Sequence, residues 1–235
     1  MSPFKSALCA AVCLLGIGTA SADPIIFESA LLQNPGQPTA GLLLYDAQWG
    51  GSRFSVDETV RVTAIGGHLT TLRGTLFGAI IPLSGPLALP DFLPSQIEQF
   101  ALGYTVFDNG QPSNDYLTPL DLVLSPGIYG IVFGGGESSN VPGITFLSDP
   151  FGSTGGGRMP DDQTRLPGVS FFFAQTASCA PNCAENDGRW SDEVNTSSVF
   201  RFVVEGVPVV PAPATLALLG LGLAGLGFSR RKHAS

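Results

Sequence analysis

Side chains that commonly perform acid–base catalysis are scarce in this sequence of 235 residues. Its two histidines are His68 and His233, and only His68 lies away from the chain ends. No G-x-S-x-G motif, which places a nucleophilic serine on a sharp turn, accompanies His68 in its sequence GGHLTTL. We therefore predict that His68 is a histidine of the surface or of a turn, without a part in serine–histidine catalysis.

Adjacent acidic residues are a second candidate for chemistry. Asp57-Glu58, Asp161-Asp162 and Asp192-Glu193 are such pairs. Glycoside hydrolysis needs two carboxyl groups about 5–10 Å apart across a sugar, and adjacency in the sequence does not provide that arrangement. Adjacent acids are also common on solvated loops. We therefore predict that the chain is not an enzyme, and a polysaccharide-acting enzyme is the least favoured alternative.

Loops rich in Asp, Asn and Gly are a candidate for binding calcium, which takes roughly six to eight oxygen ligands. One such loop runs over residues 108–115 and another over residues 185–187. Neither has the spacing of an EF-hand. The chain is predicted to need no cofactor. A structural calcium ion is the one candidate metal, with the ligands Asp108, Asn109, Asn114 and Asp115.

The chain has four cysteines, of which Cys9 and Cys13 lie in the N-terminal segment. The other two, Cys179 and Cys183, are separated by Ala-Pro-Asn. In an oxidising compartment a pair spaced in this way is predicted to form a disulfide around a tight loop. The loop is small, so the expected stabilisation is about 2 kcal/mol. The spacing is not C-x-x-C, which disfavours a redox-active role.

The elements that position these residues are predicted to be almost entirely β-strands. Short runs of β-favouring residues are separated by Gly, Pro, Asn and Asp, which is typical of an all-β sandwich, jelly-roll-like or immunoglobulin-like. Residues 94–102 alone suggest a helical turn or two. The predicted strands are residues 25–32, 42–48, 53–56, 59–65, 74–83, 101–107, 120–124, 128–133, 169–174 and 198–205.

Two further features refine this prediction. Tyr129 follows the turn Pro126-Gly127 and resembles the tyrosine corner of sandwich folds, in which the hydroxyl group bonds back to the chain. Residues 134–167 are rich in Gly, Ser, Asp and Pro and are predicted to form a long loop-like region. With the cysteine loop, this region is where we expect a binding surface.

Both ends of the chain carry targeting signals. Lys5, an apolar stretch and the small residues Ala20-Ser21-Ala22 predict a secretory signal peptide over residues 1–22, cleaved between Ala22 and Asp23. Residues 23–206 are then a single domain. Residues 207–235 consist of a Pro-rich linker, an apolar Gly/Leu run and a basic end, which would hold the C-terminus in the cytoplasm.

The charge of the predicted domain limits its partners. Four of the eleven basic residues lie in the end segments, whereas all 19 acidic residues lie within residues 23–206, which leaves a formal charge of −12. Such a surface repels nucleic acid and anionic lipid, because binding phosphate requires clustered cations. We expect no nucleic-acid partner, and contact with a membrane only through the C-terminal segment.

The C-terminal segment resembles the PEP-CTERM sorting signal of Gram-negative bacteria. The residues that carry the resemblance are Pro211, Ala212 and Pro213, the run 218–226, and Arg230, Arg231 and Lys232. Ala212 stands where the family pattern has Glu. The resemblance implies that an exosortase, a membrane sorting enzyme, recognises this segment. It also implies a transient inner-membrane anchor and a protein that is secreted or displayed at the cell surface.

The body of the chain is also similar to other PEP-CTERM-associated β domains, through the stretches GTLFGAI and LSPGIYGIVFGGG. That similarity implies a non-catalytic extracellular matrix or surface protein, associated with exopolysaccharide or biofilm. The alternative is a glycan-binding module. Its candidate stacking residues are Trp49, Trp190, Tyr45, Tyr104 and Tyr116, although burial in the core is the default for aromatic side chains.

Overall fold

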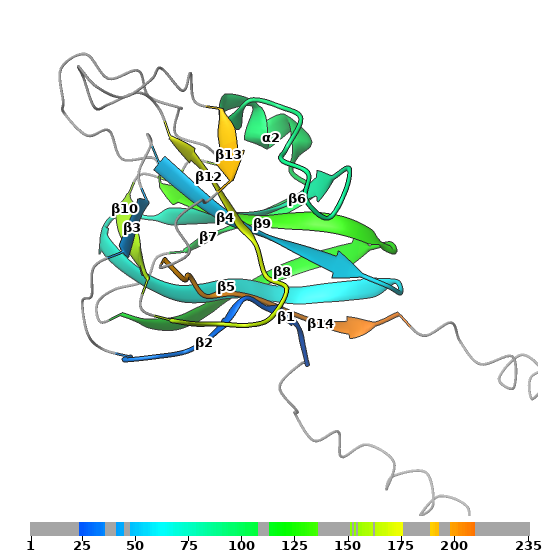
Figure 1. Ribbon diagram of the computed structural model, residues 1–235, viewed down its shortest axis with the longest axis horizontal. Helices are drawn as coiled ribbons and strands as arrows, with labels where there is room; N and C mark the ends of the chain where they lie inside the picture. The colour runs from blue at the N-terminus through cyan, green and yellow to red at the C-terminus, as the bar shows by residue number, and fades with distance from the viewer. Residues whose placement is uncertain are drawn as a thin grey trace, which may run out of the picture.

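A computed structural model describes residues 24–35, 41–44, 48–107, 113–135, 151, 153, 155–161, 163–175, 189–192 and 198–209. Most of these residues belong to two six-stranded antiparallel sheets. In Figure 1 the two sheets lie one above the other, with β5, β14 and β1 in the lower layer and β4, β9 and β6 in the upper one. The prediction of an all-β sandwich is therefore confirmed.

The order of strands in each sheet differs from their order in the chain. The first sheet has the order β1 (Ile25–Glu28), β14 (Phe202–Pro208), β5 (Val60–Arg73), β10 (Gly156–Pro160) and β3 (Gly41–Leu44), with β8 (Asn114–Leu124) also paired to β5. The second has the order β13 (Trp190–Asp192), β12 (Phe171–Gln175), β4 (Gln48–Val56), β9 (Gly127–Gly135), β6 (Leu76–Leu83) and β7 (Gly103–Phe107). A small separate sheet pairs β2 (Ala30–Leu31) with β11 (Thr164–Arg165).

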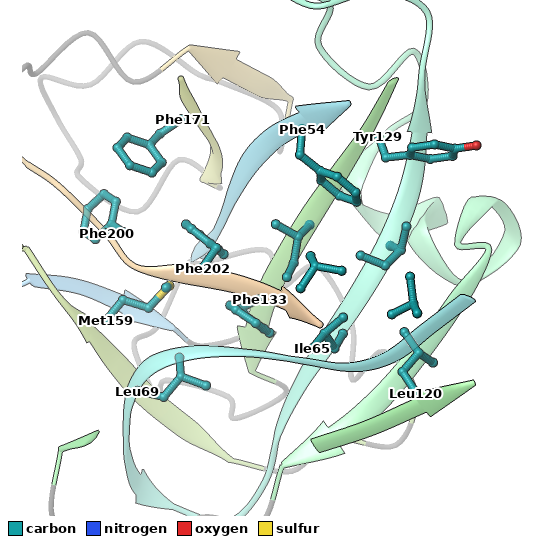
Figure 2. Close-up of a cluster of buried hydrophobic side chains, with 14 of the residues drawn as sticks. Phe54, Ile65, Leu69, Leu120, Tyr129, Phe133, Met159, Phe171, Phe200 and Phe202 are labelled. Carbon is teal, nitrogen blue, oxygen red and sulfur yellow. The ribbon is translucent and has the colours of Figure 1, made fainter. Parts of the chain in front are cut away.

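The main core fills the space between the two sheets. Phe202 of the first sheet and Phe133 of the second stack with parallel rings, 5.3 Å between centroids. Phe171 of the second sheet adds its ring beside Phe202 and Phe200. Figure 2 shows these rings together with Leu69 and Met159. Each large apolar side chain that is fully buried here contributes roughly 1.5–3 kcal/mol to folding.

A second apolar cluster covers the opposite, outer face of the second sheet. Trp49, Phe77, Val132 and Phe172 project from four neighbouring strands of this sheet and are buried. The segment that contains η2 (Pro94–Gln96) and α2 (Ile97–Phe100) lies over them, and its residue Ile97 is buried among them. In Figure 1 this segment forms the cap above the upper layer. The helical turn predicted for residues 94–102 is thus confirmed.

Burial on both faces explains the apolar run GTLFGAIIPL. In β6, Leu76 and Ile80 belong to the core between the sheets, whereas Phe77 and Ile81 belong to the outer cluster. A strand buried on both faces has no polar side to alternate with the apolar one, so its sequence is continuously apolar. The prediction of a central strand at residues 74–83 is confirmed, because β6 lies between β9 and β7.

The tyrosine corner is also present. The hydroxyl group of Tyr129 donates a hydrogen bond of 2.8 Å to the carbonyl oxygen of Ser125. Figure 2 shows that this hydroxyl points away from the core cluster while the ring lies beside Phe54. The bond ties the turn between β8 and β9 to the start of β9.

Three strands were not predicted. β10 and β11 lie within residues 134–167, which the sequence predicted as loop-like, and β13 begins at Trp190. β10 contains two glycines and a proline, and its pairing with both β3 and β5 holds it extended despite that composition. The signal peptide and the apolar C-terminal run lie outside the described residues. Within the described part of the chain, no helix has the length and apolar character needed to span a membrane.

Candidate functional site

A pocket of about 500 Å³ opens where the capping segment before α2 meets β13. Figure 1 shows these two elements side by side at one end of the upper layer. A volume of this size falls within the roughly 300–1,000 Å³ typical of small-molecule sites. The pocket is lined by Leu89, Pro90, Asp91, Phe92, Leu93, Gln96, Arg189 and Trp190.

Aromatic rings form one wall of this pocket. Phe92 meets Trp190 edge to face, with 6.3 Å between the ring centroids, and stacks on Phe100 at 4.6 Å. Trp190 in turn packs against Phe172 and Trp49 of the second sheet. Because these contacts connect the wall to the outer apolar cluster, the ring of Trp190 is held in a fixed position.

Side chains of opposite charge lie at the rim of the pocket. Asp91 and Arg189 are exposed, and neither makes a hydrogen bond or an ion pair with another residue of the described ranges. Gln96 accepts a hydrogen bond from the backbone N–H of Leu93 through Oε1, so its amide NH₂ group remains a donor. The rim therefore offers a carboxylate acceptor and two kinds of N–H donor.

Arg53 of β4 holds both sides of the pocket in place. Its side chain is buried, and its Nε donates to the carbonyl oxygen of Ala88 in the segment that leads to the pocket. Its Nη2 binds the carboxylate of Asp192 in β13 at 2.5 Å, and its guanidinium lies over the ring of Phe172. One arginine of β4 thus links both sides of the pocket to the sheet.

The lining residues of this pocket can bind a ligand through hydrogen bonds and apolar contact. Asp91 is the only carboxylate among the described lining residues, so the pocket lacks the opposed pair that glycoside hydrolysis uses. Across the described ranges, no group of three or more His, Cys, Asp or Glu side chains is placed to hold a metal ion. A small polar ligand can be oriented by the carboxylate of Asp91, the guanidinium of Arg189, the amide of Gln96 and the aromatic wall.

The prediction that His68 lies at the surface or in a turn is wrong. His68 lies inside β5, is fully buried, and has its Nε2 2.6 Å from the hydroxyl oxygen of Ser113. Ser113 is itself almost fully buried, so this serine–histidine pair does not face solvent. The two glycines before His68 suggested the end of a strand, but β5 continues through them.

Beside His68, Asp115 of the predicted calcium loop belongs to an ion cluster. Asp115 accepts hydrogen bonds from Nε of Arg201 on both carboxylate oxygens, at 3.0 and 2.8 Å. Nη1 of Arg201 also donates to Glu28 at 2.7 Å. Burial lowers the pKa of Arg201, but the hydrogen bonds to Glu28 and Asp115 raise it more, so the net shift is upward. Asp115 thus already has a cationic partner.

Of the other three predicted calcium ligands, the structure describes Asn114. Asn114 uses its side-chain oxygen to accept the backbone N–H of Asp115 at 2.9 Å. Asp108 and Asn109 lie outside the described residues, and the calcium site stays a prediction. The predicted disulfide and cleavage site, Cys179, Cys183, Ala22 and Asp23, also lie outside the described residues and stay predictions. The residues of the sorting signal, Pro211, Ala212, Pro213, Arg230, Arg231 and Lys232, lie outside the described residues as well.

The predicted stacking aromatics divide into buried and exposed residues. Trp49 is fully buried and serves the outer cluster, whereas Trp190 is buried but lines the pocket. Tyr104 is 51 % exposed and stacks on Phe151 with 4.1 Å between ring centroids. Tyr116 is half-buried against the main core, and Tyr45 lies outside the described residues.

The fold and the site thus define an all-β sandwich protein with an aromatic-walled surface pocket. At the C-terminus, residues 209–232 match the family model of the PEP-CTERM protein-sorting motif. The resemblance found in the sequence is thereby confirmed, and the motif is consistent with an exosortase substrate. It implies export, a surface or extracellular location in a Gram-negative bacterium, and an exosortase-type processing partner. No curated protein matches the chain.

Proposed function

We infer that this protein is a non-catalytic component of the extracellular matrix or cell surface, associated with exopolysaccharide in a biofilm. The observation that carries this proposal is the sorting motif at residues 209–232, joined to an acidic all-β body. An exported sandwich with a net negative surface remains soluble outside the cell and has no attraction for nucleic acid. A structural role in a matrix requires a stable fold and export from the cell. The all-β body would meet the first requirement, and the sorting motif the second.

A glycan-binding module is the second candidate function, and the pocket favours it. Its aromatic wall of Phe92 and Trp190 and its polar rim are the features that sugar recognition uses. A polysaccharide-acting enzyme is less well supported, because Asp91 is the only acid among the described lining residues.

Association with polysaccharide is tested with exopolysaccharide purified from the native host. The full chain, kept in a detergent without a sugar headgroup, is expected to bind the polymer saturably and to leave its chain length unchanged. Sedimentation measures the binding, and size-exclusion chromatography measures the polymer. A shortened polymer would contradict the non-catalytic role. Absence of binding would contradict the association and leave a structural role with protein partners.

Processing of the C-terminal segment is a separate prediction. In this proposal the segment anchors the chain transiently in the inner membrane before an exosortase-type enzyme removes the basic end. Protein isolated from the medium is therefore expected to lack Arg230, Arg231 and Lys232, as measured by intact-mass spectrometry. Secreted protein with the complete C-terminus would contradict cleavage. Protein from cells without the sorting enzyme is the control, and it is expected to retain the segment.

A further inference from the structure

The pocket beside β13 carries two opposite charges that do not pair with each other. Asp91 and Arg189 line the same opening, and within the described ranges neither has a hydrogen-bonding or ionic partner. Elsewhere in the domain, Arg53, Arg61 and Arg201 are all bound to carboxylates. The carboxylate of Asp91 and the guanidinium of Arg189 do not pair with each other. Both can therefore bind polar groups of one ligand that lies between them.

The wall and the rim together indicate the chemistry of that molecule. The exposed side chain of Leu93, with the small exposed parts of the buried Phe92 and Trp190, offers an apolar surface to the C–H face of a ring. Asp91 accepts hydrogen bonds, whereas Arg189 and the NH₂ group of Gln96 donate them. A ring with one apolar face and hydroxyl groups around its edge satisfies both parts. A pyranose has this form, and the volume of the pocket leaves room for its neighbour in a polymer.

The electrostatics select among sugars. The pocket contributes one positive and one negative side chain, so its own net charge is zero. The acidic residues outnumber the basic ones in the chain as a whole, and this negative field repels uronate, sulfate and phosphate groups on a polymer. A sugar without charged substituents avoids this repulsion, and its hydroxyl groups can hydrogen-bond to both Asp91 and Arg189.

We propose that this pocket is a binding subsite for an uncharged pyranose unit of a polysaccharide, held between Asp91 and Arg189 against the wall formed by Phe92 and Trp190. The proposal rests on the proposed association with exopolysaccharide and names the residues and the ligand class that would produce it.

Tryptophan fluorescence gives a direct readout of this site. The chain has two tryptophans, and Trp49 is fully buried, so a ligand in the pocket is expected to change the emission of Trp190. The probes are the neutral and the acidic fractions of host exopolysaccharide, separated by anion exchange. We expect the full chain in the same detergent to bind the neutral fraction, with the affinity confirmed by calorimetry.

Two rim variants test the residues. Asp91→Ala and Arg189→Ala each remove hydrogen bonds from a charged group to the ligand and are expected to weaken binding about tenfold or more. Both side chains lack partners among the described residues, so the melting temperature of each variant is expected to match that of the parent. Asp57→Ala, which removes an exposed acid between β4 and β5, is the matched control and is expected to bind as the parent does.

The outcomes separate this proposal from the proposed function. Parental affinity in both rim variants would overturn the pocket while leaving the association with polysaccharide intact. Binding of the acidic fraction alone would overturn the ligand class. Absence of binding to either fraction would overturn both the pocket and the association. Loss of binding to the neutral fraction in both variants, but not in Asp57→Ala, is the supporting result.

Discussion

Replacing Arg201 with methionine is expected to lower the free energy of unfolding by about 3 kcal/mol, which corresponds to a fall of roughly 6–12 °C in melting temperature. Arg201 binds Asp115 of β8 and Glu28 of β1, and it also donates to the carbonyl oxygen of Ala30. The backbone N–H of His68 donates to the carbonyl oxygen of Arg201, and His68 pairs with Asp115 across β5 and β8. The arginine therefore connects strands on both sides of β5.

The size of this effect follows from what the substitution leaves behind. The side chain of Arg201 is 8 % exposed, and those of Glu28 and Asp115 are 28 % and 25 % exposed. Without the guanidinium, two partly desolvated carboxylates lose their hydrogen bonds and repel each other. Removing one partner of a buried ion pair costs more than replacing the whole group with neutral residues.

A rescue experiment tests this explanation. Adding Glu28→Gln and Asp115→Asn to Arg201→Met is expected to restore much of the lost stability, because no unpaired charge then remains. Arg61→Met is the matched control. Arg61 and Asp121 form an ion pair on the exposed face of the same sheet, with 55 % and 69 % of their side chains exposed, and solvent screens such a pair. Thermal unfolding followed by circular dichroism measures all four proteins. Equal losses for Arg61→Met and Arg201→Met would contradict the account.

The sequence allowed the sandwich to be predicted because its strands carry local signals. Phe200, Phe202 and Val204 alternate with Arg201 and Val203, and the first three lie in the main core, as expected where alternate side chains point to the same face. A strand with one consistently apolar face has only one register that buries it. The continuous apolar run of β6 was equally informative, since burial on both faces removes alternation.

The pocket had no comparable signal in the sequence. Its two sides, residues 89–96 and 189–190, are far apart in the chain and meet because β12 pairs with both β4 and β13. Trp190 was a stacking candidate, but a lone tryptophan does not identify its neighbours. Arg53 was not predicted to hold the site, because its partners Ala88 and Asp192 are set by tertiary contacts.

The interpretation of His68 failed for a local reason. Gly66 and Gly67 resemble a turn, and glycine is common where a strand ends. In the structure both glycines lie inside β5, where the backbones of neighbouring strands leave no room for a side chain. At Gly67 the obstacle is the carbonyl group of Arg201, and at Gly66 it is the backbone of β8. Close approach of a neighbouring backbone, rather than chain reversal, explains these glycines.

Replacing Gly66 with alanine is therefore expected to destabilise the protein by about 3 kcal/mol or more. A Cβ atom at this position would overlap the carbonyl oxygen of Tyr116 and lie 2.9 Å from the Cα of Leu117. Both atoms belong to the backbone of β8, so no side-chain rotation relieves the contact. Because β8 pairs with β5 alone among the strands of its sheet, it is expected to be displaced and its amide protons to exchange faster than those of β9.

Two other glycines provide a graded comparison with Gly66. At Gly134 an added Cβ would meet ring atoms of Trp49 and Phe77, and side chains can shift, so Gly134→Ala is expected to cost less than Gly66→Ala. At Gly85 the nearest atom is the Cβ of Ala88 at 4.0 Å, so Gly85→Ala is expected to leave the melting temperature unchanged or slightly higher. Denaturant titration of the three variants measures the order. If Gly66→Ala were as stable as Gly85→Ala, β8 would not pass as close to β5 as the structure places it. If Gly134→Ala were the least stable, packing of the outer apolar cluster would limit stability more than the spacing of the strands.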